Sequence, residues 1–258
     1  MITHSMTIEI GSRCMQKIYQ LKNKIMPWGD YGDMLLGGMT GHENRDINGM
    51  LQLERTGPFV PQIFISGISD VILSDTLKQQ LQVSSLKLGD IAFKPVIKKK
   101  IVKLDWHTWD LTAQEPKVYP KEGEPENYIL QRPHNLNISN QLGELWELCA
   151  TVSGDIIREP VDERFWHSNI YLSIPDVSFD VFKANKTSRV FVTEEGKNYI
   201  EKYSDGWVTG EICPINERGL YIVHEWDEEG FRDMKAKSHP LNRIPYVQND
   251  IPAPEKDE

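Results

Sequence analysis

The sequence lacks an apolar run of the about eighteen residues that a membrane-spanning helix requires. The first 25 residues also lack the apolar core of a signal peptide, because Lys17, Lys22 and Lys24 fall within a mixed polar stretch. We therefore expect a cytoplasmic protein with no membrane partner. Its natural start is either Met1 or Met6.

Cysteine is scarce, and Cys14, Cys149 and Cys213 lie far apart without any Cys-x-x-Cys pair. An odd number at such spacing predicts neither a disulfide framework nor a zinc ribbon, so we expect reduced, structural cysteines. The seven histidines contain no His-x-x-x-His pair, and none stands at metal-ligand spacing from a cysteine. We expect no metal and no cofactor, and only a metal site assembled from distant residues stays open.

Basic residues are fewer than acidic ones. The 258 residues include 29 Lys and Arg and 38 Asp and Glu, which gives a formal net charge of −9. Such a balance disfavours a general phosphate-backbone binder, so we expect no nucleic-acid partner. An acidic surface attracts basic proteins, but it also serves solubility alone. Charge by itself therefore does not name a partner.

Recognisable catalytic motifs are missing as well. The one local cluster is GGMTGHENRD, residues 37–46, in which glycines precede His42, Glu43, Arg45 and Asp46. Its pattern is neither a P-loop nor a dinucleotide fingerprint, and isolated glycine-rich turns are common. We interpret it as a loop with a solvated polar tip and assign no catalytic residue.

What the sequence does contain is an internal similarity. Residues 71–96 align with residues 190–215 at a constant shift of 119 without a gap, with identical residues at Val71/Val190, Lys78/Lys197, Ser85/Ser204 and Pro95/Pro214. In each segment an apolar run ends in Ser74 or Thr193 followed by an acid, which predicts a strand running into a capped helix. Each segment then ends in an apolar-polar alternation with a proline suited to a sheet edge.

Both segments are followed by further alternation, at 102–107 and 220–226, so the unit predicted is strand, helix, strand, strand. The fold class predicted is α+β, with two similar subdomains packed together. Two unrelated units of the same local architecture are the alternative.

The remaining segments define the expected domain organisation. Four prolines among charges in 111–135 indicate a connection, and residues 137–150 predict a helix capped by Ser139 with a stripe of Leu142, Leu145, Trp146, Cys149 and Ala150. The last residues are charged and proline-containing, so we expect disorder there. The expected parts are an N-terminal segment 1–50, a first unit 51–110, a connection 111–136, a helix plus second unit 137–249, and a tail 250–258.

Two tryptophan-acid patches are candidates for partner recognition. Aromatic anchors and steering carboxylates suit a basic partner. Trp106 and Trp226 are in phase with neighbouring apolar residues, so we expect both indoles to be buried and the acids to face outward. The candidate partner-binding residues are Asp105 and Asp110 beside Trp106 and Trp109, and Glu225, Asp227, Glu228 and Glu229 around Trp226.

The run ERTGPFVPQIFISGISDVILSDTLKQQL, with FKPV, LDWHTWD, EPENYI and VFVTEEGKNYIEKYSDGW after it, resembles bacterial immunity proteins that accompany polymorphic or type VI secretion toxins. The resemblance spans roughly residues 50–215 and lacks the paired Cys-x-x-Cys segments of some relatives. It implies stoichiometric binding of a cognate toxin, with a basic toxin domain as the partner that the acidic surface favours.

A second hypothesis is an enzyme. A hydrolase that reverses a toxin's modification requires a concave pocket in which His42, His107 or His224 meets a carboxylate of perturbed pKa. The absence of a catalytic motif and the resemblance favour the inhibitor over the hydrolase. The oligomeric state is not predicted by any feature of the sequence.

Overall fold

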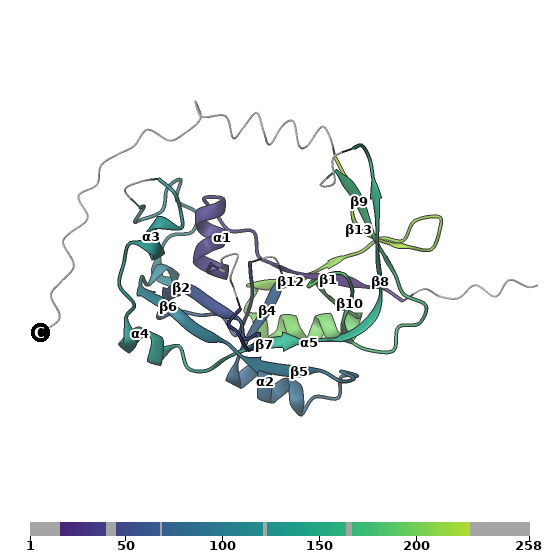
Figure 1. Ribbon diagram of the computed structural model, residues 1–258, viewed down its shortest axis with the longest axis horizontal. Helices are drawn as coiled ribbons and strands as arrows, with labels where there is room; N and C mark the ends of the chain where they lie inside the picture. The colour runs from purple at the N-terminus through teal and green to yellow at the C-terminus, as the bar shows by residue number, and fades with distance from the viewer. Residues whose placement is uncertain (1–15, 40–44, 68, 121–122, 164–166, 228–258) are drawn as a thin grey trace, which may run out of the picture.

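The computed structural model describes residues 16–39, 45–67, 69–120, 123–163 and 167–227 (Figure 1). Helices and many strands occur together, so the predicted α+β class is confirmed. The tail 250–258, for which disorder is predicted, lies outside the described residues.

Residues 71–96, the first of the two similar segments, lie in a four-stranded antiparallel sheet. Its strand order is β3 (Ile63–Ser66), β4 (Asp70–Ser74), β7 (Leu145–Cys149) and β5 (Ala92–Pro95). Helix α2 (Asp75–Gln82) follows β4, and the Ser74 hydroxyl accepts a hydrogen bond from Leu77 N at 3.2 Å. The predicted cap and the predicted edge position of Pro95 are confirmed.

The 190–215 segment belongs to a seven-stranded sheet. The order is β12 (Val208–Ile212), β1 (Tyr19–Asn23), β11 (Val190–Val192), β10 (Val181–Asn185), β8 (Thr151–Pro160), β9 (Ser168–Ser173) and β13 (Tyr221–His224). Helix α5 (Glu194–Ser204) follows β11, and the Thr193 hydroxyl accepts from Gly196 N at 3.2 Å. The second predicted cap is therefore confirmed too.

The strand order β10-β11-β1-β12 repeats the order β3-β4-β7-β5. In both, the central strand comes from a distant part of the chain and lies antiparallel between the two strands that the helix connects. Trp146 of β7 pairs with Leu73 and Pro95, whereas Tyr19 of β1 pairs with Val192 and Ile212. The sequence alignment at a shift of 119 therefore agrees with the structure in the first strand, where Leu73 corresponds to Val192. In the closing strand the structural correspondence differs from it by two residues, because Pro95 corresponds to Ile212. A difference of two residues keeps every side chain on the same face of the sheet.

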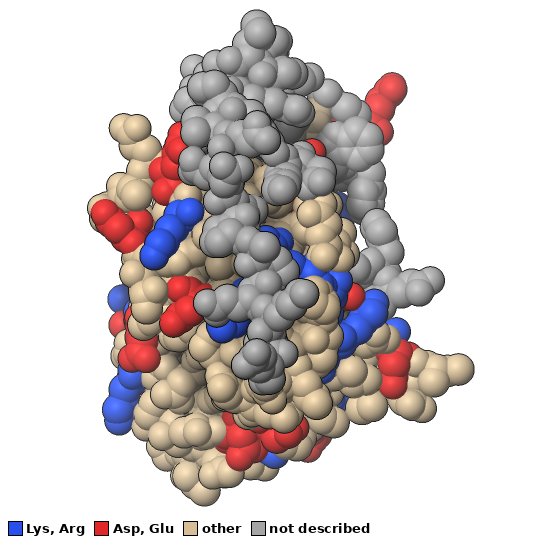
Figure 2. All heavy atoms as spheres, turned by 90° about the vertical axis from the view of Figure 1, so that its left-hand side faces the viewer, with Lys and Arg blue, Asp and Glu red and all other residues tan. Residues whose placement is uncertain are grey.

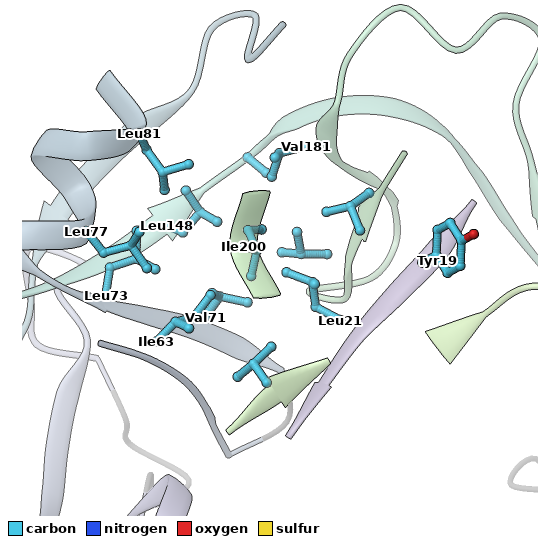
Figure 3. Packing of buried hydrophobic residues seen from close by; sticks show 14 residues of the cluster. Tyr19, Leu21, Ile63, Val71, Leu73, Leu77, Leu81, Leu148, Val181 and Ile200 are labelled. Carbon is cyan, nitrogen blue, oxygen red and sulfur yellow. The ribbon is translucent and has the colours of Figure 1, made fainter. Parts of the chain in front are cut away.

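One hydrophobic core joins the two units. Ile200 of α5 lies in its middle, with Leu73 and Leu148 of the first sheet on one side and Leu21 on the other (Figure 3). The Tyr199 hydroxyl, also on α5, donates to the Gln80 carbonyl of α2 at 2.8 Å. The buried members are Tyr19, Leu21, Ile63, Val71, Leu73, Leu77, Leu81, Leu148, Ala150, Val181, Val190, Val192, Ile200 and Val208.

A polar contact also joins the units, at the edge of the four-stranded sheet. The Asn23 side chain donates to the Ile65 carbonyl at 2.7 Å and accepts from Ile65 N at 2.8 Å. Because β3 has no strand partner on that side, the Asn23 amide takes the place of a strand residue and satisfies both backbone groups.

A parallel strand pair and short helices complete the fold. They are β2 (Gln52–Gly57), β6 (Ile97–Lys103), α1 (Asp30–Gly37), α3 (Asn127–Leu130), α4 (Leu136–Gln141) and the 3-10 turn η1 (Trp106–Thr108). Lys98 of β6 donates to the Ser139 and Gly143 carbonyls, both at 2.9 Å, and Lys100 donates to the Leu130 carbonyl at 2.7 Å. These ammonium groups bind the carbonyl ends of α4 and α3, which are too short to be stable alone.

The helix predicted over 137–150 is wrong beyond Gln141. Its cap is Asn135 rather than Ser139, and Gly143 has a φ of 68°, which ends the helical path. Leu145–Cys149 then forms β7, the central strand of the first sheet. The strand expected over 102–107 likewise ends at Lys103, whereas β13 falls within the range expected for the second strand.

We predict that Asn23→Ala lowers the free energy of unfolding by about 1–3 kcal/mol, because it leaves the Ile65 amide and carbonyl without partners inside the fold. Urea denaturation would measure the loss. The matched control is Asn185→Ala, which removes an exposed side-chain hydrogen bond to Asp155 and should cost less than about 0.5 kcal/mol. Equal losses in the two variants would contradict this role for Asn23.

Candidate functional site

The glycine-rich cluster is partly structural. A Cβ atom on Gly37 would lie 2.7 Å from the Ile65 carbonyl oxygen, and Gly38, with a φ of 73°, packs against the Cβ of Arg55. These two glycines therefore permit close packing, which accounts for them without a phosphate. His42 and Glu43 lie outside the described residues.

Arg45 is not part of a solvated tip, which corrects the prediction for this residue. Its guanidinium donates to both Glu147 oxygens, at 2.8 and 2.7 Å, and to Asp70 Oδ1 at 3.0 Å. The Glu147 side chain is only 9% exposed, so this bidentate pair links the cluster to the centre of β7. Asp46 similarly accepts from Asn48 N and Met50 N and closes a turn.

The two tryptophan-acid patches differ from each other. Trp106 is fully buried, as predicted, in a core with α1 and α3. Trp226 is only half-buried and stacks on the His167 ring with centroids 3.7 Å apart, so the prediction of a buried indole is wrong there. The Trp226 amide donates to Asn169 of β9 at 2.8 Å, which places the second patch on the seven-stranded sheet, away from the first.

The predicted partner-binding acids that the structure describes are exposed. They are Asp105, Asp110, Glu225 and Asp227, whereas Glu228 and Glu229 lie outside the described residues. The Asp110 carboxylate accepts hydrogen bonds from the Thr112 side chain and backbone, which lower its pKa. The patches are thus on the surface as predicted, but they form two separate sites.

The histidines proposed for a hydrolase do not meet the expected carboxylate within the described residues. His107 stacks on Phe59 with ring centroids 4.0 Å apart. The pKa of His224 is lowered, first by partial burial and then by the charges of Arg189 and Lys22. The histidine that does contact a carboxylate is His167, whose Nδ1 lies 2.7 Å from Asp162 Oδ2 beneath the Trp226 ring. In the same described ranges no three His, Cys, Asp or Glu side chains gather as metal ligands.

A groove of about 720 Å³ runs between β1, α1 and the β3–β4 connection. Three carboxylates line it, Asp30 and Asp33 from the first turn of α1 and Glu126 from the start of α3. Apolar side chains form other parts of its wall, Ile25, Met34, Met39 and Ile65 among them, and Lys22 and Lys24 also contribute. Sequence reasoning did not identify this groove, because its walls come from four separate segments.

The three carboxylates of this groove, which we call the acidic groove, are exposed, and Asp33 accepts a backbone hydrogen bond from Met26. Burial, followed by the nearby Asp30 charge, raises the pKa of Asp33. Across the described part of the chain, neither these two aspartates nor Glu126 takes part in an ion pair. The Lys24 ammonium lies over the Trp207 ring, 5.1 Å from its centroid. The groove therefore holds negative charge that a cation from outside would stabilise.

The entrance to the acidic groove has a strained backbone and an exposed apolar side chain. Trp28 has a φ of 68°, unusual for a bulky residue, and its indole donates to the Ala113 carbonyl at 3.0 Å. Ile25 is 92% exposed. The Trp28 ring also contacts Trp109, with centroids 6.1 Å apart, so the first tryptophan-acid patch contacts the chain two residues before Asp30 of the groove. In the sequence, the run MPWGD at residues 26–30, with a bulky residue before Gly29, is the feature that could have indicated this unusual backbone.

Comparison of the chain with protein-family models and with the curated proteins finds no match. Among the described residues, no helix combines the length and the apolar character needed to cross a bilayer.

We predict that Arg45→Ala lowers the free energy of unfolding by about 2–4 kcal/mol, because it strands the carboxylates of Glu147 and Asp70. Burial raises the pKa of Asp70 and Arg45 lowers it, so the pKa rises further in the variant. A carboxyl with a raised folded pKa destabilises the protein above that pKa, so the loss should shrink as the pH falls and Asp70 becomes protonated.

Denaturation curves at several pH values would test this. Arg45→Lys should recover only part of the stability, since an ammonium cannot bind both Glu147 oxygens in the same way. A loss that is the same in Arg45→Ala and in Arg45→Lys at every pH would refute the assignment.

Proposed function

We propose that this chain is an immunity protein that binds a cationic toxin domain in the cytoplasm of the producing cell and neutralises it stoichiometrically. The observation that carries the proposal is the acidic groove, in which Asp30, Asp33 and Glu126 are gathered and form no ion pair within the described residues. The formal net charge of −9 and the resemblance of residues 50–215 to immunity proteins support it.

The proposal follows from the repulsion between like charges. Asp30 and Asp33 are exposed carboxylates one helical turn apart, and they repel each other. A lysine or arginine of a partner would offset the repulsion at the moment of binding, and the exposed Ile25 side chain beside it offers an apolar contact. The groove thus has both components of a docking site for a basic protein.

On the face that Figure 2 shows, acidic and basic side chains are interspersed where the described residues are visible. A partner attracted only by net charge would therefore have no preferred orientation on that face, whereas the groove supplies one. We place Asp105 and Asp110 at the rim of the same interface, because Trp109 adjoins Trp28. Glu225 and Asp227 form a separate candidate.

We also propose that the two units arose by duplication of one ancestral unit. The shared strand order supports this, and so do two equivalent contacts: the Lys78 ammonium lies 3.2 Å from the Trp146 ring centroid, and the Lys197 ammonium 5.5 Å from that of Tyr19. Each lysine stands four residues after its helix cap, and each ring occupies the corresponding place on the central strand. Chance similarity of architecture would not require this pair of contacts.

We predict that the neutralising triple variant Asp30→Asn, Asp33→Asn, Glu126→Gln slows association with the toxin domain encoded beside this gene by about ten-fold at low salt. Neutral amides are chosen because lysines would disfavour the first turn of α1. Biolayer interferometry with the full chain would measure the rate, and survival of toxin-expressing cells would measure protection. The difference should narrow as salt rises, since screening weakens exposed charges.

The matched control neutralises three exposed acids elsewhere, in the variant Asp90→Asn, Asp176→Asn, Glu217→Gln. It should associate within about two-fold of the parent. If the control slows binding as much as the groove variant, net charge rather than the groove drives association. If only Glu225→Lys with Asp227→Lys abolishes protection, the interface lies at the second patch.

A further inference from the structure

The seven-stranded sheet is rolled so that its two edges meet. Beyond β12, Ile215 bridges Tyr221 of β13, and Ile222 N donates to the Pro214 carbonyl at 2.6 Å. The Tyr221 hydroxyl donates to the Gln16 carbonyl at 2.8 Å, next to the start of β1. The rolled sheet encloses its own core, made of Ile18, Ile156, Ile170, Leu172, Phe182, Ala184, Phe191, Cys213 and Tyr221.

The strand register brings basic side chains to one end of this core. On β1, Lys22 follows Ile18 by four residues, on the same face. On the chain entering β11, Arg189 precedes the core residue Phe191 by two residues and lies one step beyond the Lys183–Val190 pair. On β8 and β13, Arg158 and His224 both pair with Ile170 of the core. By register all four side chains belong to the inner face at the same end of the apolar core, where Arg189 is half-buried and Lys22, Arg158 and His224 are exposed.

Their mutual influence agrees with this placement. Burial and then Arg158 lower the pKa of Arg189. Lys22 belongs to β1, which only β12 separates from β13 in the rolled sheet, and Lys22 contributes to the lowered pKa of His224. Among the described acids, Glu211 faces this end and forms an ion pair with Lys22, and Arg158 makes a further interaction of its own. Arg189 is half-buried, and within the described residues its guanidinium has neither a hydrogen bond nor an ion pair.

We propose that this basic end of the rolled sheet, formed by Lys22, Arg158, Arg189 and His224, binds the phosphate group of a small ligand. A phosphate group carries up to two negative charges and three acceptor oxygens, which matches a guanidinium fork with further cations around it. The apolar core beneath is filled by Phe182 and Phe191, so only the charged group would sit on Arg189 and the rest of the ligand would point outward.

Several features favour a small ligand over nucleic acid. The basic end is confined to one end of a single sheet, Lys22 is already paired, and the chain as a whole is acidic. A nucleic-acid backbone requires an extended basic track for its affinity. A phosphate monoester and inorganic phosphate both carry the phosphate group that this site would bind, and the experiment below distinguishes between these two ligands.

Isothermal titration calorimetry with inorganic phosphate, adenosine monophosphate and adenosine tests the proposal on the full chain. Both phosphates should bind and adenosine should not, and a tighter monophosphate would identify an ester as the natural ligand. Arg189→Met should raise the Kd for phosphate by about ten-fold or more. The control Arg218→Met removes an exposed arginine that pairs with Glu159, and it should leave the Kd within about two-fold.

A second variant makes the test independent of whether Arg189→Met folds. Glu211→Gln removes the acid that competes for Lys22, so phosphate should bind more tightly than to the parent by about three-fold. Equal Kd values for the parent and Arg189→Met, or weaker binding by Glu211→Gln, would overturn the proposal. Binding of a DNA duplex through Arg189 without binding of phosphate would also overturn it. Toxin binding does not enter either measurement, so this result and that for the acidic groove are separate.

Discussion

The hydrophobic core shared by the two units is the constraint on which the rest of the structure depends. Each four-strand arrangement packs one face against this core. Ile200 of α5 and Leu77 of α2 enter the same cluster, together with strands of both sheets. Burial of a leucine or isoleucine side chain contributes about 1.5–3 kcal/mol, so separating the units would expose an apolar face of each. Asn23 and Tyr199 add direction to a contact that is otherwise non-directional.

This shared core also determines where the two candidate sites lie. Because α5 and β3 pack against β1, the first residues after β1 are fixed beside the β3–β4 connection, and there the acidic groove forms. The other face of β1 belongs to the rolled sheet, and Lys22, which also borders the acidic groove, extends toward its basic end. One strand thus borders two sites of opposite charge, one suited to a basic protein and the other to a phosphate group.

Local features were predictable from the sequence, and distant pairings were not. Ser74 and Thr193 were predicted as helix caps because a cap depends on neighbours three residues away. Residues 145–149 were predicted as helix because their apolar stripe fits a helical period, and nothing local indicates insertion between β4 and β5. Arg45 and Glu147 are 102 positions apart in the chain, so their bidentate pair has no local signal. The acidic groove and the basic end have the same origin, because segments remote in sequence supply their walls.

The placement of β1 and β7 has a consequence for biosynthesis. Both are inner strands of their sheets. The partners of β1, which are β11 and β12, are synthesised much later than β1, whereas the partners of β7, which are β4 and β5, are synthesised much earlier than β7. A ribosome therefore releases the first strand of the second sheet long before its partners exist. Pairings of such long sequence separation form slowly, because loop closure precedes any gain from contacts. The nascent chain therefore holds β1, whose Tyr19 and Leu21 are buried in the folded protein, without its full set of partners until residue 212 has emerged.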